Sequence, residues 1–157
     1  MTHAIPEFTV EQLEAEGRVD LAHFDNADAF ALGTIATGVI AEWGVNLGVD
    51  IVVDGYLAYR ARLGSTGVGN DPWLAGKAAV ANHFGVSSLL VRLRQEATGV
   101  PFTDLELDHD VMRAHGGSVP IFVAGSPVAT ITMSGEPDVV DHETARESLD
   151  RYLASLS

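Results

Sequence analysis

Lys77 is the only lysine in the chain, and its surroundings make it the first candidate for chemistry. Asp71 as N-cap and Pro72 at the first helical position predict a helix that runs to Phe84. Helical spacing places one lysine within a row of large apolar side chains, namely Trp73, Lys77, Val80 and Phe84. A buried ammonium there needs a partner. Two alternatives stay open: a structural ion pair (or an ammonium that reaches solvent), and an ammonium that binds an anionic ligand in a pocket.

The segment His115-Gly116-Gly117 is the second candidate. Paired glycines let the backbone approach a ligand closely or adopt positive φ. The imidazole of His115 could donate to a carboxylate, transfer a proton or ligate iron, although a structural hydrogen bond is an equally good reading.

Three other patterns are weaker. The loop Gly64–Gly69 has the glycine spacing of a phosphate-binding loop, but Asn70-Asp71 follows where that motif needs Lys and Ser/Thr. The alternating acids of 104–110 lack the glycine and the final glutamate of a calcium loop. Ser134 and His142 offer hydrolase residue types without a nucleophile elbow. We therefore predict no metal site and assign no catalytic residue.

Composition narrows the class of protein. The chain has 157 residues, no cysteine and a formal net charge of −13. Such a surface repels phosphate backbones and anionic lipid, so we expect neither nucleic-acid nor membrane binding. The apolar stretch 29–41 is shorter than a membrane span, and the first residues lack the pattern of a signal peptide. We expect a soluble, cytoplasmic protein that forms a single domain over residues 1–157.

The order of predicted elements indicates an α+β fold. Asp54-Gly55 between two apolar runs predicts a hairpin, and a second hairpin is expected to turn at Gly125-Ser126. The predicted strands are 49–53, 56–63, 103–108, 120–124 and 128–134; the predicted helices begin near Thr9, Asp25, Asp71, Ser87 and Asp138. Hairpins without crossovers favour an antiparallel sheet flanked by helices, profilin-like or PAS-like in shape.

Several short segments occur together in one order and carry a resemblance to a known family. They are Phe24-Asp25-Asn26-Ala27-Asp28-Ala29, Asn70-Asp71-x-Trp73-x-x-x-Lys77, Phe84-Gly-x-Ser87-Ser88, His115-Gly116-Gly117-x-x-Pro120-Ile121, Thr132-x-Ser134-Gly135 and Asp141-His142. From about Phe24 to the C-terminus, the chain resembles a family of small uncharacterised proteins grouped with the heme-degrading-domain (GlcG/HbpS-like) proteins.

The resemblance implies a small α/β fold that assembles into dimers or larger rings, and it suggests heme as a ligand. Heme fits a basic group beside an apolar wall, because its propionates are anionic and its ring is hydrophobic. The candidate ligand-binding residues are Asn70, Asp71, Trp73, Lys77, His115, Gly116, Gly117 and Ser134. We expect a domain that binds, or helps to degrade, heme or a related small anionic ligand. The alternative is a non-catalytic module for assembly or partner binding.

Overall fold

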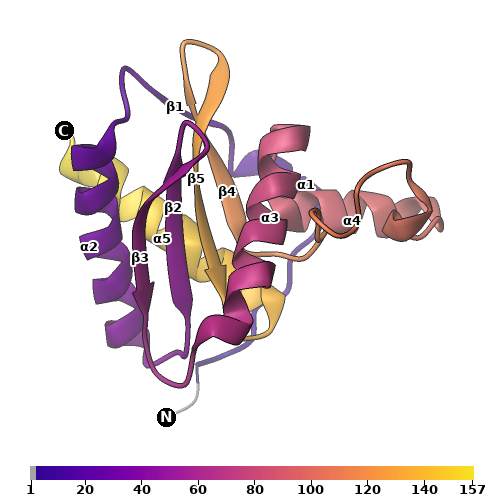
Figure 1. Ribbon diagram of the computed structural model, residues 1–157, viewed down its shortest axis with the longest axis horizontal. Coiled ribbons are helices and arrows are strands. Elements are labelled where there is room, and N and C mark those ends of the chain that lie inside the picture. Colours follow the sequence, from indigo (N-terminus) through magenta and orange to yellow (C-terminus); the bar gives the residue numbers. More distant parts are fainter. Residues whose placement is uncertain (1–2) are drawn as a thin grey trace.

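The computed structural model describes residues 3–157, which form one five-stranded sheet with helices on both faces (Figure 1). The strands lie in the order β1-β4-β5-β2-β3. Their bounds are β1 Val19–Leu21, β2 Gly48–Val53, β3 Tyr56–Arg62, β4 Ser118–Val123 and β5 Ser126–Ser134. All neighbours pair antiparallel except β1 and β4, which are parallel. The predicted α+β fold is confirmed, and the sheet is antiparallel except for β1, which pairs parallel to β4.

The helices divide between the two faces of the sheet. Their bounds are α1 Val10–Ala15, α2 Asn26–Trp43, α3 Asp71–Phe84, α4 Ser88–Thr98 and α5 Asp138–Ser155. Helices α2 and α5 pack together on one face, where Val49 and Ile51 of β2 point into the main core. Helix α3 covers the other face, where Val52 lies near Ala75 and Ala78. Alternate β2 side chains therefore support different helices.

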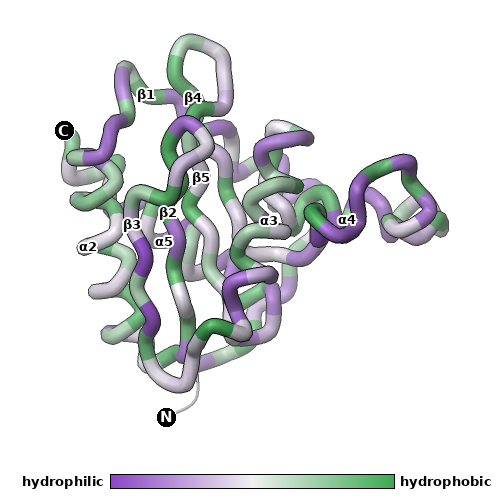
Figure 2. The backbone as a smooth tube through the Cα atoms, in the orientation of Figure 1, coloured by the Kyte–Doolittle hydropathy of each residue, from purple (hydrophilic) through white to green (hydrophobic). Residues whose placement is uncertain are grey.

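Local sequence signals account for most element ends. Asp54 and Gly55 both have positive φ, 51° and 84°, as the hairpin between β2 and β3 requires. Asp25 accepts from the backbone of Asp28, whose side chain reaches back to cap α2. Figure 2 shows hydrophilic and hydrophobic stretches alternating along β3, the edge strand.

Two predictions about local structure are wrong. The segment 103–108 is no strand: a short 3-10 helix, Phe102–Asp104, is followed by irregular backbone that projects beside α4 (Figure 1). Its alternating pattern reflects solvent exposure, since no strand lies next to it. Asp71 does not cap α3 either, because Asn70 holds the cap position and the Asp71 carboxylate pairs with Arg60 and Arg62.

The residues before α2 add to the same sheet, and they place Val19 in the main core and Leu13 in a smaller apolar cluster with Leu89 and Leu90. Helix α1 packs against α4, and β1 adds to the edge of β4. The side chains of Leu13 and Val19 are buried. Among the helices of residues 3–157, none has the length and apolar character needed to cross a bilayer.

Candidate functional site

The Lys77 ammonium is buried and has a carboxylate partner. Its Nζ donates to Oδ2 of Asp141 at 2.8 Å and to the carbonyl oxygen of Met133 at 3.0 Å. Lys77 is only 3% exposed and Asp141 only 1%. The ion pair links α3 to α5 at the end of β5. The structural alternative considered for Lys77 is thus present, and one of the three ammonium N–H groups is left for other contacts.

Gly117 makes room for this pair. Its φ is +136°, which residues with a side chain rarely adopt, and its carbonyl accepts from Met133 N at 2.9 Å. A Cβ at Gly117 would lie 2.3 Å from the Met133 carbonyl oxygen and 3.1 Å from Lys77 Nζ. The neighbouring Gly116 N–H donates to Asp138 Oδ2 at 2.8 Å, which fixes the start of α5 against this turn.

A cleft of ≈ 350 Å³ opens above the ion pair. It gathers residues from four parts of the chain: Asn70, Trp73, Lys77, His115, Ser134, Gly135, Glu136, Asp138 and Asp141. Five of the eight candidate residues line it. Gly116 and Gly117 follow His115 in the chain but do not line the cleft. The Asp71 carboxylate accepts hydrogen bonds from Arg60 and Arg62 of β3 instead.

Three acids of this cleft were absent from the predicted set, namely Glu136, Asp138 and Asp141. Asp141 accepts from Glu136 N at 3.0 Å as well as from Lys77. Burial raises the pKa of Asp141 from 3.8 to about 6, although Lys77 acts in the opposite direction. Asp138 pairs with Arg92 at 2.8 Å. Of these three acids, only Asp141 belonged to a segment that carried the family resemblance, Asp141-His142.

His115 stands at the rim of the cleft. The ring of His115 meets that of Trp73 edge-on, with 5.1 Å between the ring centroids. The Arg113 guanidinium stacks on the same Trp73 ring, 4.3 Å from its centroid. Burial lowers the pKa of His115 below 6.5, and the cations Lys77, Arg92 and Arg113 lower it further, against the opposing effect of Asp138. The imidazole is therefore mostly neutral at pH 7.

The same imidazole also lines a second, adjoining pocket of ≈ 410 Å³. Its other walls come from α4 and the segment after it: Arg92, Gln95, Glu96, Gly99, Val100, Pro101, Phe102 and Ala114. Its apolar wall, formed by Val100, Pro101, Phe102 and Ala114, is larger than that of the cleft, to which Trp73 contributes. His115 thus separates an acidic, polar cleft from a more apolar pocket.

The hydrolase residue types do not assemble into a catalytic group. Ser134 lines the cleft, whereas His142 is fully buried elsewhere, with its Nε2 2.8 Å from Glu16 Oε1 and its ring against Phe8. Asp141 is held by Lys77. Serine and histidine therefore face different partners.

Known proteins resemble the chain in sequence and in fold. The UPF0303 protein SCO2848 of Streptomyces coelicolor is 38% identical over 148 residues, which are 92% of this chain and 94% of that protein. The UPF0303 protein Bcenmc03_1534 of Burkholderia orbicola is 36% identical over 81% of this chain and 78% of its own length.

Three solved structures share the fold. The Ybr137w protein superposes with a TM-score of 0.82 at 29% identity, covering 97% of this chain and 92% of its own. HbpS gives 0.68 at 20% identity over 83% and 91%, and the PduOC:heme complex gives 0.64 at 18% over 81% and 93%. Residues 24–150 match the family described as haem degrading protein HbpS-like, so the chain belongs to the HbpS-like family.

Proposed function

We propose that the protein is a ligand-binding domain whose ligand lies against His115, in the groove formed by the cleft and the adjoining apolar pocket. One observation carries the proposal: a single imidazole, that of His115, lines both pockets. Heme is the ligand that we propose to test first, because the family is described as haem degrading and one solved structure of the same fold is the PduOC:heme complex.

The apolar pocket suits the porphyrin better than the cleft does. The apolar wall around Val100 and Phe102 matches a porphyrin face, and His115 would hold the iron through its neutral imidazole. The acidic interior of the cleft is a poor place for propionates, since Glu136 and Asp138 line it. Lys77 is already paired with Asp141, so we do not assign a propionate contact to Lys77. Bound heme would supply redox-active iron; this chain would supply the ligand and the wall.

Titration of the purified protein with hemin tests this proposal. We expect a saturable shift of the Soret band that His115→Ala abolishes and that His23→Ala leaves intact. His23 is a suitable control because its side chain is 77% exposed and lies just before α2, far along the chain from both pockets. Absence of any spectral change at micromolar hemin, or equal binding by both variants, would refute heme binding at His115. If the Soret band is then lost when a reductant and oxygen are added, the bound heme is being degraded.

A second candidate function, assembly with further copies of the chain, has a separate observation in its favour. Tyr56, Leu57 and Phe30 around the edge strand β3 are 80%, 50% and 67% exposed. Light scattering after size-exclusion chromatography would report the mass in solution. Assembly through this edge predicts that Tyr56→Glu lowers the mass while hemin binding stays unchanged. The cytoplasmic location predicted from the sequence belongs to the proposal as well, and cell fractionation tests it.

A further inference from the structure

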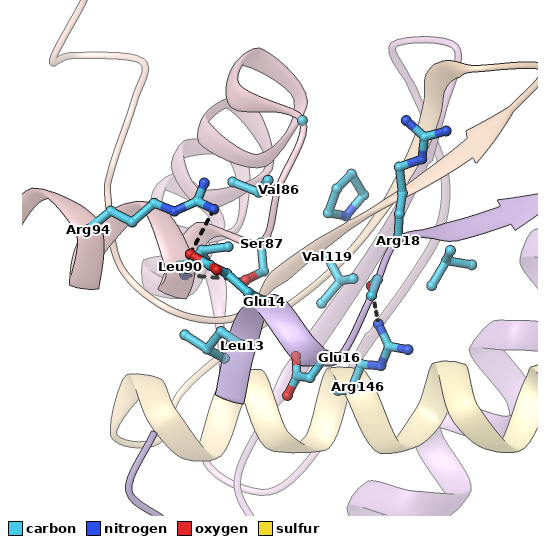
Figure 3. Close-up of a pocket in the computed structure, with 14 residues that line it drawn as sticks. Leu13, Glu14, Glu16, Arg18, Val86, Ser87, Leu90, Arg94, Val119 and Arg146 are labelled. Atoms are coloured by element: carbon cyan, nitrogen blue, oxygen red, sulfur yellow. Dashed lines mark hydrogen bonds and ion pairs between the residues drawn. The ribbon is translucent and has the colours of Figure 1, made fainter. Parts of the chain in front are cut away.

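A third pocket lies away from the candidate site and shares no lining residue with it. It has a volume of ≈ 460 Å³ and lies between α1, the start of α4, β4 and α5 (Figure 3). Its apolar walls are the side chains of Leu13, Val86, Leu90, Val119 and Pro120. This volume is within the range of about 300–1,000 Å³ that small-molecule sites occupy.

Three arginines from three elements line this pocket. Arg18 precedes β1, Arg94 belongs to α4 and Arg146 belongs to α5. The whole chain has only nine basic residues and a formal net charge of −13, so this concentration of positive charge runs against the composition. Figure 3 shows Arg18 and Arg94 on opposite sides of the pocket in this view, with Val86 and Val119 between them.

Internal contacts use only part of the hydrogen-bonding capacity of these arginines. Arg94 donates one hydrogen bond, to Glu14, and Arg18 donates one, to Asp20. Arg146 donates to Asp150 and to the Gly17 carbonyl. Each guanidinium carries five N–H donors. Within residues 3–157, most of these donors have no protein acceptor and are available to a ligand.

The two carboxylates in the lining determine the charge that the pocket can accept. Glu14 is paired with Arg94, and Glu16 lies 2.8 Å from His142 Nε2. Asp20 and Asp150, just outside the lining, pair with Arg18 and Arg146, so the unused guanidinium N–H donors, and not an excess of positive charge, would attract a ligand. A carboxylate matches the guanidinium fork and carries one charge, whereas a phosphate dianion would meet more repulsion from the two glutamates.

We propose that this pocket binds a small amphipathic monoanion, a carboxylate on a short apolar chain, with the head group at Arg94 and the chain along Val86 and Val119 toward the side of Arg18. The site depends on a segment outside the HbpS-like match, because residues 13–19 form one wall and the match covers residues 24–150. Because the pocket shares no lining residue with the two pockets at His115, the proposal does not rest on heme binding there.

Calorimetric titration of the full chain with octanoate, and with octan-1-ol as the uncharged probe, tests the proposal. We expect octanoate to bind and octan-1-ol to bind at least about tenfold more weakly. Binding should weaken at high salt, because the attraction is electrostatic. Equal binding of the two probes, or no heat from millimolar octanoate, would overturn it.

Charge-matched variants locate the site. Arg18→Gln and Arg94→Gln change side chains that are about half exposed, 52% and 49%, so the fold should survive. The double variant should weaken octanoate binding at least about tenfold. Arg62→Gln combined with Arg151→Gln removes the same two charges outside the pocket and should bind like the unchanged protein. Weakening by this control equal to that of the double variant would show a non-specific charge effect and overturn the proposal.

Discussion

Lys77 of α3 and Asp141 of α5 meet at 2.8 Å although 64 residues separate them in the chain. Both side chains are almost fully buried, and β5 contributes a third partner through the Met133 carbonyl. The pair connects a helix on one face of the sheet to a helix that packs on the other. Each charge depends on its partner, because burial removes most of the water that would otherwise stabilise it.

Removing the ammonium alone should destabilise the protein strongly. Lys77→Met leaves the Asp141 carboxyl buried without its cation, and we expect the free energy of unfolding to fall by about 3–5 kcal/mol. Urea denaturation followed by circular dichroism measures this. Arg62→Met, which removes a half-exposed cation from the Asp71 pair, serves as the control and should cost at most about 1 kcal/mol. A loss below 1 kcal/mol for Lys77→Met would contradict the interpretation.

The double variant Lys77→Met with Asp141→Leu should recover much of the loss. Apolar groups of similar size can replace a buried ion pair at little cost once both charges are gone. The double variant should therefore be more stable than Lys77→Met alone. If its destabilisation equals the sum of both single variants, the two residues are not coupled.

Asp141 should give the stability an unusual pH dependence. Its pKa in the folded protein is about 6, above the ordinary 3.8, so the folded chain keeps this proton to higher pH than the unfolded chain. The contribution to stability is full below pH 3.8 and is lost as the pH rises through 6. The loss is about 3 kcal/mol, at roughly 1.4 kcal/mol per pKa unit.

Denaturation of the unchanged protein and of Asp141→Asn at several pH values from 4 to 7 isolates this group. The stability of the unchanged protein relative to the variant should fall across that window. Carbon NMR of the Asp141 carboxyl provides a direct check, with a titration midpoint near 6. A midpoint at 3.8 or below would show that the attraction of Lys77 outweighs burial.

Two glycines of α2 should respond in opposite directions to alanine. A Cβ at Gly33 would lie 2.5 Å from the ring of Tyr59, so Gly33→Ala should lower the free energy of unfolding by about 1–3 kcal/mol. Gly38 is exposed, with nothing within 4 Å of such a Cβ. Gly38→Ala should stabilise by up to about 1 kcal/mol, because alanine favours helix. Equal effects in thermal denaturation would contradict this packing.

Iron binding by His115 should tolerate mild acid. Burial holds its pKa below 6.5, so the imidazole stays neutral and able to ligate at pH values where an ordinary histidine is half protonated. The Soret shift with hemin should persist at pH 6.5 and decline below it. A decline centred above pH 7 would argue against this histidine as the ligand.

Local chemistry made much of the fold predictable. The Asp54-Gly55 turn, the capping box at Thr9 and the glycines that end α3 and α4 act within a few residues, and all are present. Strand β1 was missed because its three residues become a strand only by pairing with β4, about a hundred positions later. Leu57 is half exposed because the register shifts between Ile51 and Val52, which turns the start of β3 outward and cannot be read from the alternation of residue types.

The candidate site, like the fold, was predictable only where neighbouring residues determine it. Helical spacing placed Lys77 in an apolar row and required a partner for it, and that requirement is met. Which acid would meet it depends on how α5 packs, and no local pattern contains that information. The same holds for Asp71: its type suggested a helix cap or a ligand contact, but two arginines of the neighbouring β3 take its carboxylate.

The position of β1 has a practical consequence for how this protein can be shortened. A chain that began at the first residue of the HbpS-like match, 24, would lose Leu13, Val19 and the strand that covers β4. The backbone groups of β4 along that edge would then be open to pairing with another chain. The family match therefore begins within the folded structure, after β1, and we expect a protein shortened to residue 24 to aggregate.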